Sequence, residues 1–328
     1  MTAHPGPELV TTDPARAADA LRAGHLAVLP TETVYGLGAR AVDPRAVARV
    51  YAVKGRPADH PLIVHLPDVA ALAHWAADVP TYAQRLAEAL WPGPLTLVLP
   101  RGRRAGLHVT GGQSTVGLRV PDHPLTRSVL ATLDDGVAAP SANIFGRVSP
   151  TTVTHVVDEI GARLLPGRDV VLDGGPCRVG VESTIVDGTG PAPRILRPGG
   201  VGTEEIVEIG GVAIDRTEGT VRAPGMLASH YAPTARVRVV DAAGLAQEAD
   251  DGERPTTGLL APSEVPTPVG LVRLAAPQSA AQYAEVLYAA LREADALALS
   301  RVLAVPPSSG ALADAVLDRL RRSSVGSS

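Results

Sequence analysis

Short apolar segments alternate with helix-like segments along most of the chain, and this alternation predicts an α/β protein. Turn residues separate the segments, since the 328 residues include 33 glycines and 30 prolines. These residues have no three-residue period, so they indicate turns and not a collagen-like helix. Aromatic residues make up only 3% of the chain, so leucine, valine and alanine must fill the core.

Two groups of elements are predicted, and they indicate two domains joined by a linker. The first group has helices over 13–24, 43–53, 68–77, 80–90, 123–133 and 151–160, and strands over 25–30, 61–66, 94–99, 115–120, 136–140, 169–173, 182–187 and 193–197. The second group has strands over 237–241, 257–262, 269–274 and 301–306, and helices over 279–297 and 309–322. We therefore predict an N-terminal domain over 1–215, a linker over 216–235 and a C-terminal α/β domain over 236–328.

Composition and charge exclude several classes of protein. No apolar run reaches the roughly 18 residues of a membrane-spanning helix, and the N-terminus has no signal-peptide pattern, so we expect a cytoplasmic protein without membrane association. Cys177 is the only cysteine, which excludes an internal disulfide and a multi-cysteine zinc site. No histidines have metal-binding spacing, so we expect no metal site made by the protein. The net charge of −4 argues against strong direct binding of nucleic acid.

Rare residues point to the first candidate site. Lys54 is the only lysine, Asn143 the only asparagine and Phe145 the only phenylalanine. Such a skew indicates that these residues are replaced wherever the change is harmless, so the survivors are candidates for a chemical need. Lys54 and Arg56 in a Gly-Pro loop can both face an anion, and Ser141 and Asn143 can hold phosphate oxygens or a ribose. We expect these side chains to serve an anion and not the core; a solvated charge pair and an Asx-turn are the alternative.

The segment 30–38, PTETVYGLG, is predicted to be a loop with hydroxyl groups and glycines that permit close approach of a polar ligand. Its glycines do not follow a strand directly, so we reject a dinucleotide-binding motif. Arg119 and Arg197 end two predicted strands, where each can hold a carboxylate or a phosphate or make a surface salt bridge. His65 can be a ligand contact or a structural residue. The segment 224–233 can be a spacer or a lid.

Seven motifs occur in an order that resembles a known family, the YrdC-like threonylcarbamoyl-AMP synthases, in the form with a linker and a C-terminal domain. The motifs are PTETVYGLG, KGRPADHPLIVH, VGLRVPDHP, APSAN with GRVSPTT, GVESTIVD, ILRPGG and APGMLASHYAP. The resemblance covers residues 13–235 through motifs and 236–322 more weakly. It implies a twisted mixed sheet with helices, followed by a smaller Rossmann-like α/β domain.

The resemblance also implies an activity: the formation of threonylcarbamoyl-AMP and pyrophosphate from L-threonine, ATP and bicarbonate or CO₂, with Mg²⁺ accompanying ATP. The product serves the machinery that places threonylcarbamoyladenosine next to the tRNA anticodon. The alternative from another class is an RNA- or tRNA-binding protein that uses the same concave face. Whether CO₂ or bicarbonate is the donor stays open.

Residue roles follow by motif match. The resemblance implies that four residues form a catalytic group around the bound nucleotide: Lys54, Arg56, Ser141 and Asn143. It implies further ATP contacts by His60, Thr115, Ser149, Arg197, His230 and Tyr231, the last two closing over the nucleotide. It implies a threonine pocket of Thr33, His65, Arg119, the main chain near Ala139, and Ser183, with Arg119 on the carboxylate and Thr31 as a competitor for the role of Thr33.

Two positions depart from the family pattern. His60 stands where the family often has asparagine, and Ile144-Phe145 stand where it often has Pro-Ser. Phe145 can stack on adenine or only fill space, and the sequence leaves both open.

Overall fold

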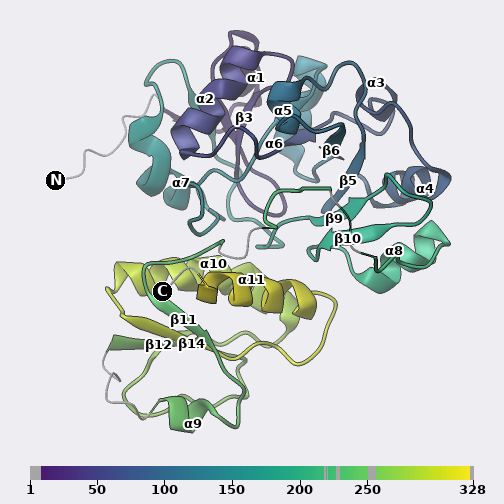
Figure 1. Ribbon diagram of the computed structural model, residues 1–328. Coiled ribbons are helices and arrows are strands. Elements are labelled where there is room, and N and C mark those ends of the chain that lie inside the picture. Colours follow the sequence, from purple (N-terminus) through teal and green to yellow (C-terminus); the bar gives the residue numbers. More distant parts are fainter. Residues whose placement is uncertain (1–8, 218, 220, 227–229, 250–255, 326–328) are drawn as a thin grey trace. The chain divides into compact units, whose positions relative to one another are not determined.

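The computed structural model describes residues 9–217, 219, 221–226, 230–249 and 256–325 (Figure 1). The chain divides into two compact units. The first comprises Met1–Phe145, Pro150–Cys177 and Glu182–Met226, and the second comprises Gly146–Ser149, Arg178–Val181 and Leu227–Ser328.

The first unit is built on a mixed ten-stranded sheet. Its strand order is β1 (Val10–Thr11), β8 (Val170–Leu172), β2 (Ala27–Leu29), β3 (Gly36–Arg40), β7 (Val137–Ala138), β4 (Ile63–His65), β6 (Thr115–Arg119), β5 (Leu95–Pro100), β9 (Thr184–Asp187) and β10 (Arg194–Arg197). β4 runs parallel to β6, β6 antiparallel to β5, and β5 parallel to β9. Strands far apart in sequence therefore become neighbours at the centre of the sheet.

Helices cover this sheet and begin and end at residues suited to those positions. They are α1 (Pro14–Arg22), α2 (Pro44–Lys54), α3 (Leu72–Trp75), α4 (Thr81–Leu90), α5 (Leu107–Thr110), α6 (Pro124–Leu133), α7 (Val153–Ile160), a 3-10 turn (Gly161–Arg163) and α8 (Thr203–Gly210). At α2, the Asp43 carboxylate accepts hydrogen bonds from the N–H groups of Arg45 and Ala46, and Gly55 ends the helix with a left-handed φ of 63°. This ending places Lys54 on the last helical turn and Arg56 directly after it.

The core of the first unit is mostly aliphatic, as the low aromatic content predicts. Leu26, Val28, Leu37 and Val64 are fully buried. Trp75 is among the few large aromatic side chains in it and is 2% exposed.

The second unit has a parallel four-stranded sheet in the order β11 (Arg236–Val239), β14 (Arg301–Ala304), β12 (Thr257–Leu260) and β13 (Val272–Ala275). Its helices are α9 (Leu245–Glu248), α10 (Ala280–Ala296) and α11 (Ala313–Val325). α10 packs against α11, and α11 packs against β11. The predicted Rossmann-like character is confirmed by the parallel strands and their helical connections.

The structure corrects some predicted elements. The segment 30–38 is not a loop throughout, because β3 begins at Gly36 and pairs with both β2 and β7. A side chain at Gly38 would place its Cβ 2.8 Å from the Ala27 oxygen, so the glycine permits this pairing. The helix predicted over 68–77 is limited to Leu72–Trp75. β1, α5, α8 and α9 were not predicted; each of them is no longer than eight residues.

Gly199 allows the segment after β10 to lie against the residues that precede β9. A Cβ built there would lie 2.3 Å from the Glu182 oxygen and 2.3 Å from the Ser183 carbonyl carbon. Only a residue without a side chain can lie against the start of β9 in this way.

We predict that Gly199→Ala lowers the free energy of unfolding by about 1–3 kcal/mol, because the added methyl group overpacks main-chain atoms. Urea unfolding measures this change. Gly210→Ala is the matched control: outside its own helix, the atom nearest to the added Cβ would be the Tyr82 Cβ at 4.0 Å, so the change should cause no loss of stability. Equal stability of the Gly199 variant and the wild type would contradict the close approach.

Candidate functional site

Residues predicted to bind threonine gather at one edge of the first unit's sheet. His65 ends β4 and Arg119 ends β6, and the two are register partners on neighbouring strands. Ser183 directly precedes β9. Ala139 follows β7, and its N–H donates to the Ile63 oxygen at 3.0 Å. The sheet order therefore brings together residues that are widely separated in the sequence.

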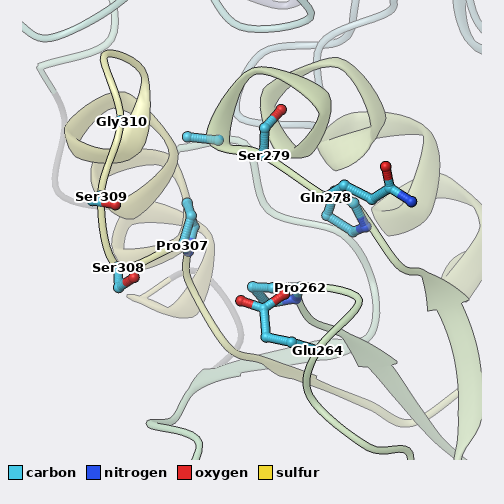
Figure 2. A pocket seen from close by; sticks show the side chains of 10 residues that line it. Pro262, Glu264, Gln278, Ser279, Pro307, Ser308, Ser309 and Gly310 are labelled. Atoms are coloured by element: carbon cyan, nitrogen blue, oxygen red, sulfur yellow. The ribbon is translucent and has the colours of Figure 1, made fainter.

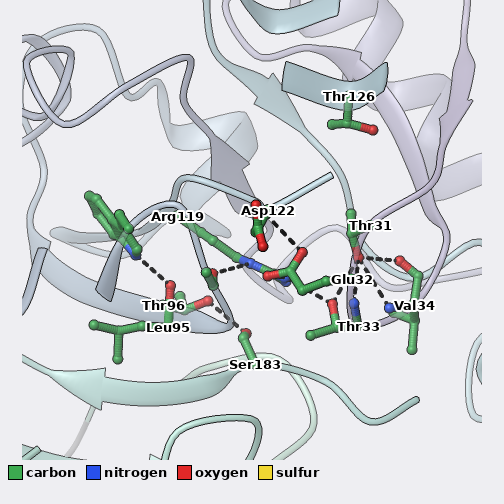
Figure 3. A network of polar contacts seen from close by, with 12 residues as sticks. Thr31, Glu32, Thr33, Val34, Leu95, Thr96, Arg119, Asp122, Thr126 and Ser183 are labelled. Carbon is green, nitrogen blue, oxygen red and sulfur yellow. Dashed lines mark hydrogen bonds and ion pairs between the residues drawn. The ribbon is translucent and has the colours of Figure 1, made fainter. Parts of the chain in front are cut away.

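Arg119 is the centre of a buried polar network (Figure 3). The residue is 4% exposed, and its Nη2 lies 2.6 Å from Oε1 of Glu32, which is 2% exposed. Nη2 also donates to the Thr33 hydroxyl at 3.0 Å, and Nε donates to the Gly93 oxygen at 3.2 Å. Among the residues that the structure describes, none accepts a hydrogen bond from Nη1. One side of the guanidinium is thus fixed by the protein, and the other can receive a carboxylate.

The sequence analysis missed Glu32. The Asp122 N–H donates to its second carboxylate oxygen at 3.0 Å, so the carboxylate is held as well as paired. A single carboxylate within a segment rich in hydroxyl groups was the available signal. Without Glu32 the charge of Arg119 would be buried with no counter-charge.

The hydrogen bonds of the Thr31 and Thr33 hydroxyl groups show which of the two threonines contacts Arg119. The Thr31 hydroxyl donates its only proton to the Val34 oxygen at 2.6 Å. It lies 2.8 Å from the Thr33 hydroxyl, so Thr33 must donate to Thr31. Thr33 in turn accepts from Arg119. Thr33 is therefore the threonine that orients Arg119, and its hydroxyl proton is already used within the protein.

Ser183 contacts both Thr96 and Arg197. The hydroxyl groups of Thr96 and Ser183 lie 2.8 Å apart. Figure 3 marks this contact by a dashed line. Arg197 donates from Nε and Nη2 to the Ser183 main-chain oxygen at 3.2 and 2.9 Å, and from Nη1 to the Pro224 oxygen at 3.1 Å. Arg197 is 3% exposed, so it is a buried residue and not a surface residue.

His65 is neutral in this environment. Burial, with Arg119 as a second cause, lowers the pKa of His65 from 6.5 to about 3. Its Nδ1 is buried and has no hydrogen-bond partner among the described residues. A neutral imidazole beside a guanidinium avoids like-charge repulsion.

This shift predicts a pH dependence of stability. Between pH values of about 3 and 6.5 the unfolded chain binds a proton at His65 that the folded protein does not bind. Stability therefore rises with pH across this window, by up to about 1.4 kcal/mol per pH unit from this residue. We predict that His65→Gln flattens the dependence of the unfolding free energy on pH, measured by urea titrations between about pH 4 and pH 6. The exposed His74→Gln is the control and should retain the wild-type slope; equal slopes in both variants would contradict the assignment.

The rare basic and amide residues also come together, as predicted. The Lys54 ammonium donates to the Ser141 oxygen at 2.5 Å and to the Asn143 oxygen at 2.6 Å. Lys54 is only 1% exposed, and burial together with Arg56 lowers its pKa well below the usual value. The expectation that Lys54 serves an anion and not the core is therefore wrong in its second part, because the buried side chain ties the last turn of α2 to the segment 141–143.

Arg56 and His60 lie beside this junction. Arg56 is 8% exposed and donates from Nη2 to the Pro61 oxygen at 2.9 Å. His60 packs against the ring of Phe145, with centroids 5.3 Å apart. The basic loop, residues 54–60, and Phe145 in the segment after Asn143 thus form one cluster.

Comparison with known proteins identifies the group to which these features belong. A family model described as Telomere recombination matches residues 19–199, and one described as Threonylcarbamoyl-AMP synthase, C-terminal domain, matches 201–325. A Pyrococcus abyssi threonylcarbamoyl-AMP synthase is 38% identical over 324 residues, covering 94% of this chain and 93% of that protein. The chain belongs to the threonylcarbamoyl-AMP synthase family.

Other members of the synthase family support this assignment. A Bacillus subtilis threonylcarbamoyl-AMP synthase is 42% identical over 243 residues, covering 71% of this chain and 69% of that protein. The structure of P. abyssi Sua5 complexed with L-threonine is similar with a TM-score of 0.85 and 36% identity, covering 97% of each chain. The predicted family, fold class and nucleotidyltransferase-type activity are confirmed.

Three more residues are implied as ATP contacts by the synthase resemblance: Thr115, Ser149 and His230. Thr115 begins β6, at the other end of the strand from Arg119. Ser149 is buried in a segment that groups with the second unit, and His230 also belongs to that unit. Their roles at the nucleotide stay predictions.

Tyr231 is anchored within the second unit. Its φ is 61°, unusual for a residue with a side chain, and it is 1% exposed. The centre of its ring lies 5.2 Å from the Arg319 guanidinium and 5.7 Å from the centre of the stacked Tyr288 ring. Its main-chain oxygen accepts a hydrogen bond from the Ser323 hydroxyl at 2.9 Å. The remaining predicted linker includes residues 218, 220 and 227–229, which lie outside the described residues.

The second unit of the synthase also has a pocket of about 290 Å³ (Figure 2). The loops after β12, β13 and β14 line it, at the carboxyl ends of these parallel strands. Glu264 is its charged lining residue, and none of the predicted site residues lines it. Within the described part of the chain, no helix is both long and apolar enough to cross a membrane.

Proposed function

We propose that this enzyme joins L-threonine, CO₂ or bicarbonate, and ATP into threonylcarbamoyl-AMP at the edge of the sheet that holds Arg119. The observation that supports this most strongly is the arrangement of Arg119: Nη2 and Nε are fixed by the protein, and Nη1 has no acceptor among the described residues. A guanidinium held in this way can bind the α-carboxylate of an amino acid.

The reaction proceeds in two balanced steps. The neutral amine of threonine adds to CO₂ and loses a proton, which gives a carbamate; from bicarbonate, the amine gives the same carbamate with loss of one water molecule and no net release of a proton. A carbamate oxygen then forms a bond to the α-phosphorus of ATP, and the bond from that phosphorus to the bridging oxygen of the β-phosphate breaks. Pyrophosphate leaves. The negative charge that accumulates at phosphorus requires cations nearby.

This chain can supply those cations and hold them still. Arg56 faces the phosphates in our proposal, and Lys54 keeps Ser141 and Asn143 in place through their main-chain oxygens. Arg197, fixed on Ser183, contributes a further buried positive charge. The chemistry therefore relies on positioning and on charge neutralisation, without a covalent enzyme intermediate.

Mg²⁺ is proposed to enter with ATP. The described residues contain no group of three or more histidines, cysteines, aspartates or glutamates that could hold a metal ion. A magnesium ion bound mainly by phosphate oxygens and water suits such a site, because Mg²⁺ commonly uses few protein ligands. When bound, it would neutralise phosphate charge.

The product is a mixed anhydride of a carbamate and a phosphate, so it is reactive and must be passed on. We propose that tRNA threonylcarbamoyl-transfer enzymes receive it, and that the reaction takes place in the cytoplasm, where these partners and tRNA are found.

The direct experiment measures pyrophosphate release from ATP, with each substrate omitted in turn and with L-serine in place of L-threonine. We expect release to require both L-threonine and bicarbonate. Release that is independent of threonine, or no release from folded protein that binds ATP, would contradict the proposed function.

Removing Arg119 tests the threonine pocket. We predict that Arg119→Ala raises the KM for L-threonine by at least about 30-fold, the effect of losing a buried charge pair of roughly 2 kcal/mol, and changes the KM for ATP far less. Steady-state pyrophosphate release measures both constants. Arg22→Ala, which removes an exposed ion pair with Asp19, is the control and should leave both unchanged. Equal increases in both constants for the Arg119 variant would place this residue outside the threonine pocket.

A further inference from the structure

Two of the residues that depart from the family pattern, His60 and Phe145, lie in contact. The rings of His60 and Phe145 have centroids 5.3 Å apart and meet edge to face at 85°. The Arg56 guanidinium lies over the Phe145 ring, 5.5 Å from its centroid. The only phenylalanine of the chain is thus packed between a histidine and an arginine of the basic loop.

Hydrogen bonds to main-chain oxygens hold Phe145, His60 and Arg56 in place. The Phe145 N–H donates to the Lys54 oxygen at 2.9 Å, which ties the ring to the end of α2. The Tyr51 hydroxyl donates to the His60 oxygen at 3.0 Å. Arg56 donates to the Pro61 oxygen at 2.9 Å, so its guanidinium is fixed at one nitrogen and faces an aromatic ring.

The charge distribution suits this packing. The face of an aromatic ring attracts a cation, and its edge is electropositive. Burial and the neighbouring Arg56 lower the pKa of His60, which favours a neutral imidazole beside the Phe145 ring. A charged imidazole at this position would repel Arg56.

We propose that Phe145 is a positioning residue for Arg56 and that His60 braces the Phe145 ring. This inference rests on the role of Arg56 at the ATP phosphates given under the proposed function. A guanidinium already ordered before ATP arrives loses less side-chain freedom on binding, so ATP binds more tightly. Phe145 then acts through Arg56 and does not stack on adenine.

A double-mutant cycle tests this directly. Phe145→Leu removes the ring but keeps an apolar side chain, and Phe145→Trp keeps an aromatic face. We expect Phe145→Leu to raise the KM and calorimetric Kd for ATP about five-fold, the order of one cation–π interaction, with the KM for L-threonine unchanged. Phe145→Trp should recover most of the loss. In an Arg56→Met background, Phe145→Leu should have no further effect on the Kd for ATP.

The neighbouring half-buried Ile144→Val is the matched control, and it should leave both KM values unchanged. An equal loss of ATP affinity from Phe145→Leu in the Arg56→Met background would show that the ring contacts the nucleotide itself, which overturns the proposal. No change in ATP affinity in the wild-type background would also overturn it. If the wild type releases no threonine-dependent pyrophosphate, the proposed function fails, while the calorimetric cycle still decides whether Phe145 acts through Arg56.

Discussion

The buried charge of Arg119 is the constraint on which the candidate site depends. A guanidinium that is 4% exposed is stable only with a counter-charge and with acceptors for its N–H groups. Glu32 supplies the charge, and Thr33 and Gly93 supply oxygens. These partners come from loops next to different strands, so the mixed sheet order is what assembles them. In our proposal, a substrate carboxylate accepts the hydrogen bond from Arg119 Nη1 for which the described residues provide no acceptor.

A second buried cation organises the neighbouring cluster in a different way. The Lys54 ammonium is neutralised by no carboxylate in direct contact in the described structure, and it donates to the main-chain oxygens of Ser141 and Asn143. The interaction joins the end of α2 to the segment that carries Phe145. Arg56 therefore follows a residue that is held on two main-chain oxygens. The residues around Arg119 and those around Lys54 are each held in place by their own hydrogen bonds. This division agrees with a reaction in which an amino acid and a nucleotide must be held separately and then joined.

Much of the fold could be predicted from the sequence because its signals are local. Gly55 ends a helix by its left-handed conformation, and the rarity of Lys54 pointed to 141–143, which the structure brings to it. Burial could not be predicted, because whether a lysine faces solvent or carbonyl oxygens depends on residues 87 positions away. The pairing of Glu32 with Arg119 was missed for the same reason: it depends on the order of the strands in the sheet, which the local sequence pattern does not predict.

The central claim is that a carbamate formed on threonine attacks ATP at this site. The most direct measurement is mass spectrometry of the nucleotide product formed from ATP, L-threonine and ¹³C-bicarbonate. We expect an adenylate that contains threonine and one labelled carbon, together with pyrophosphate. An adenylate of threonine without the label would show that the amino acid carboxylate attacks ATP directly, and it would contradict the account.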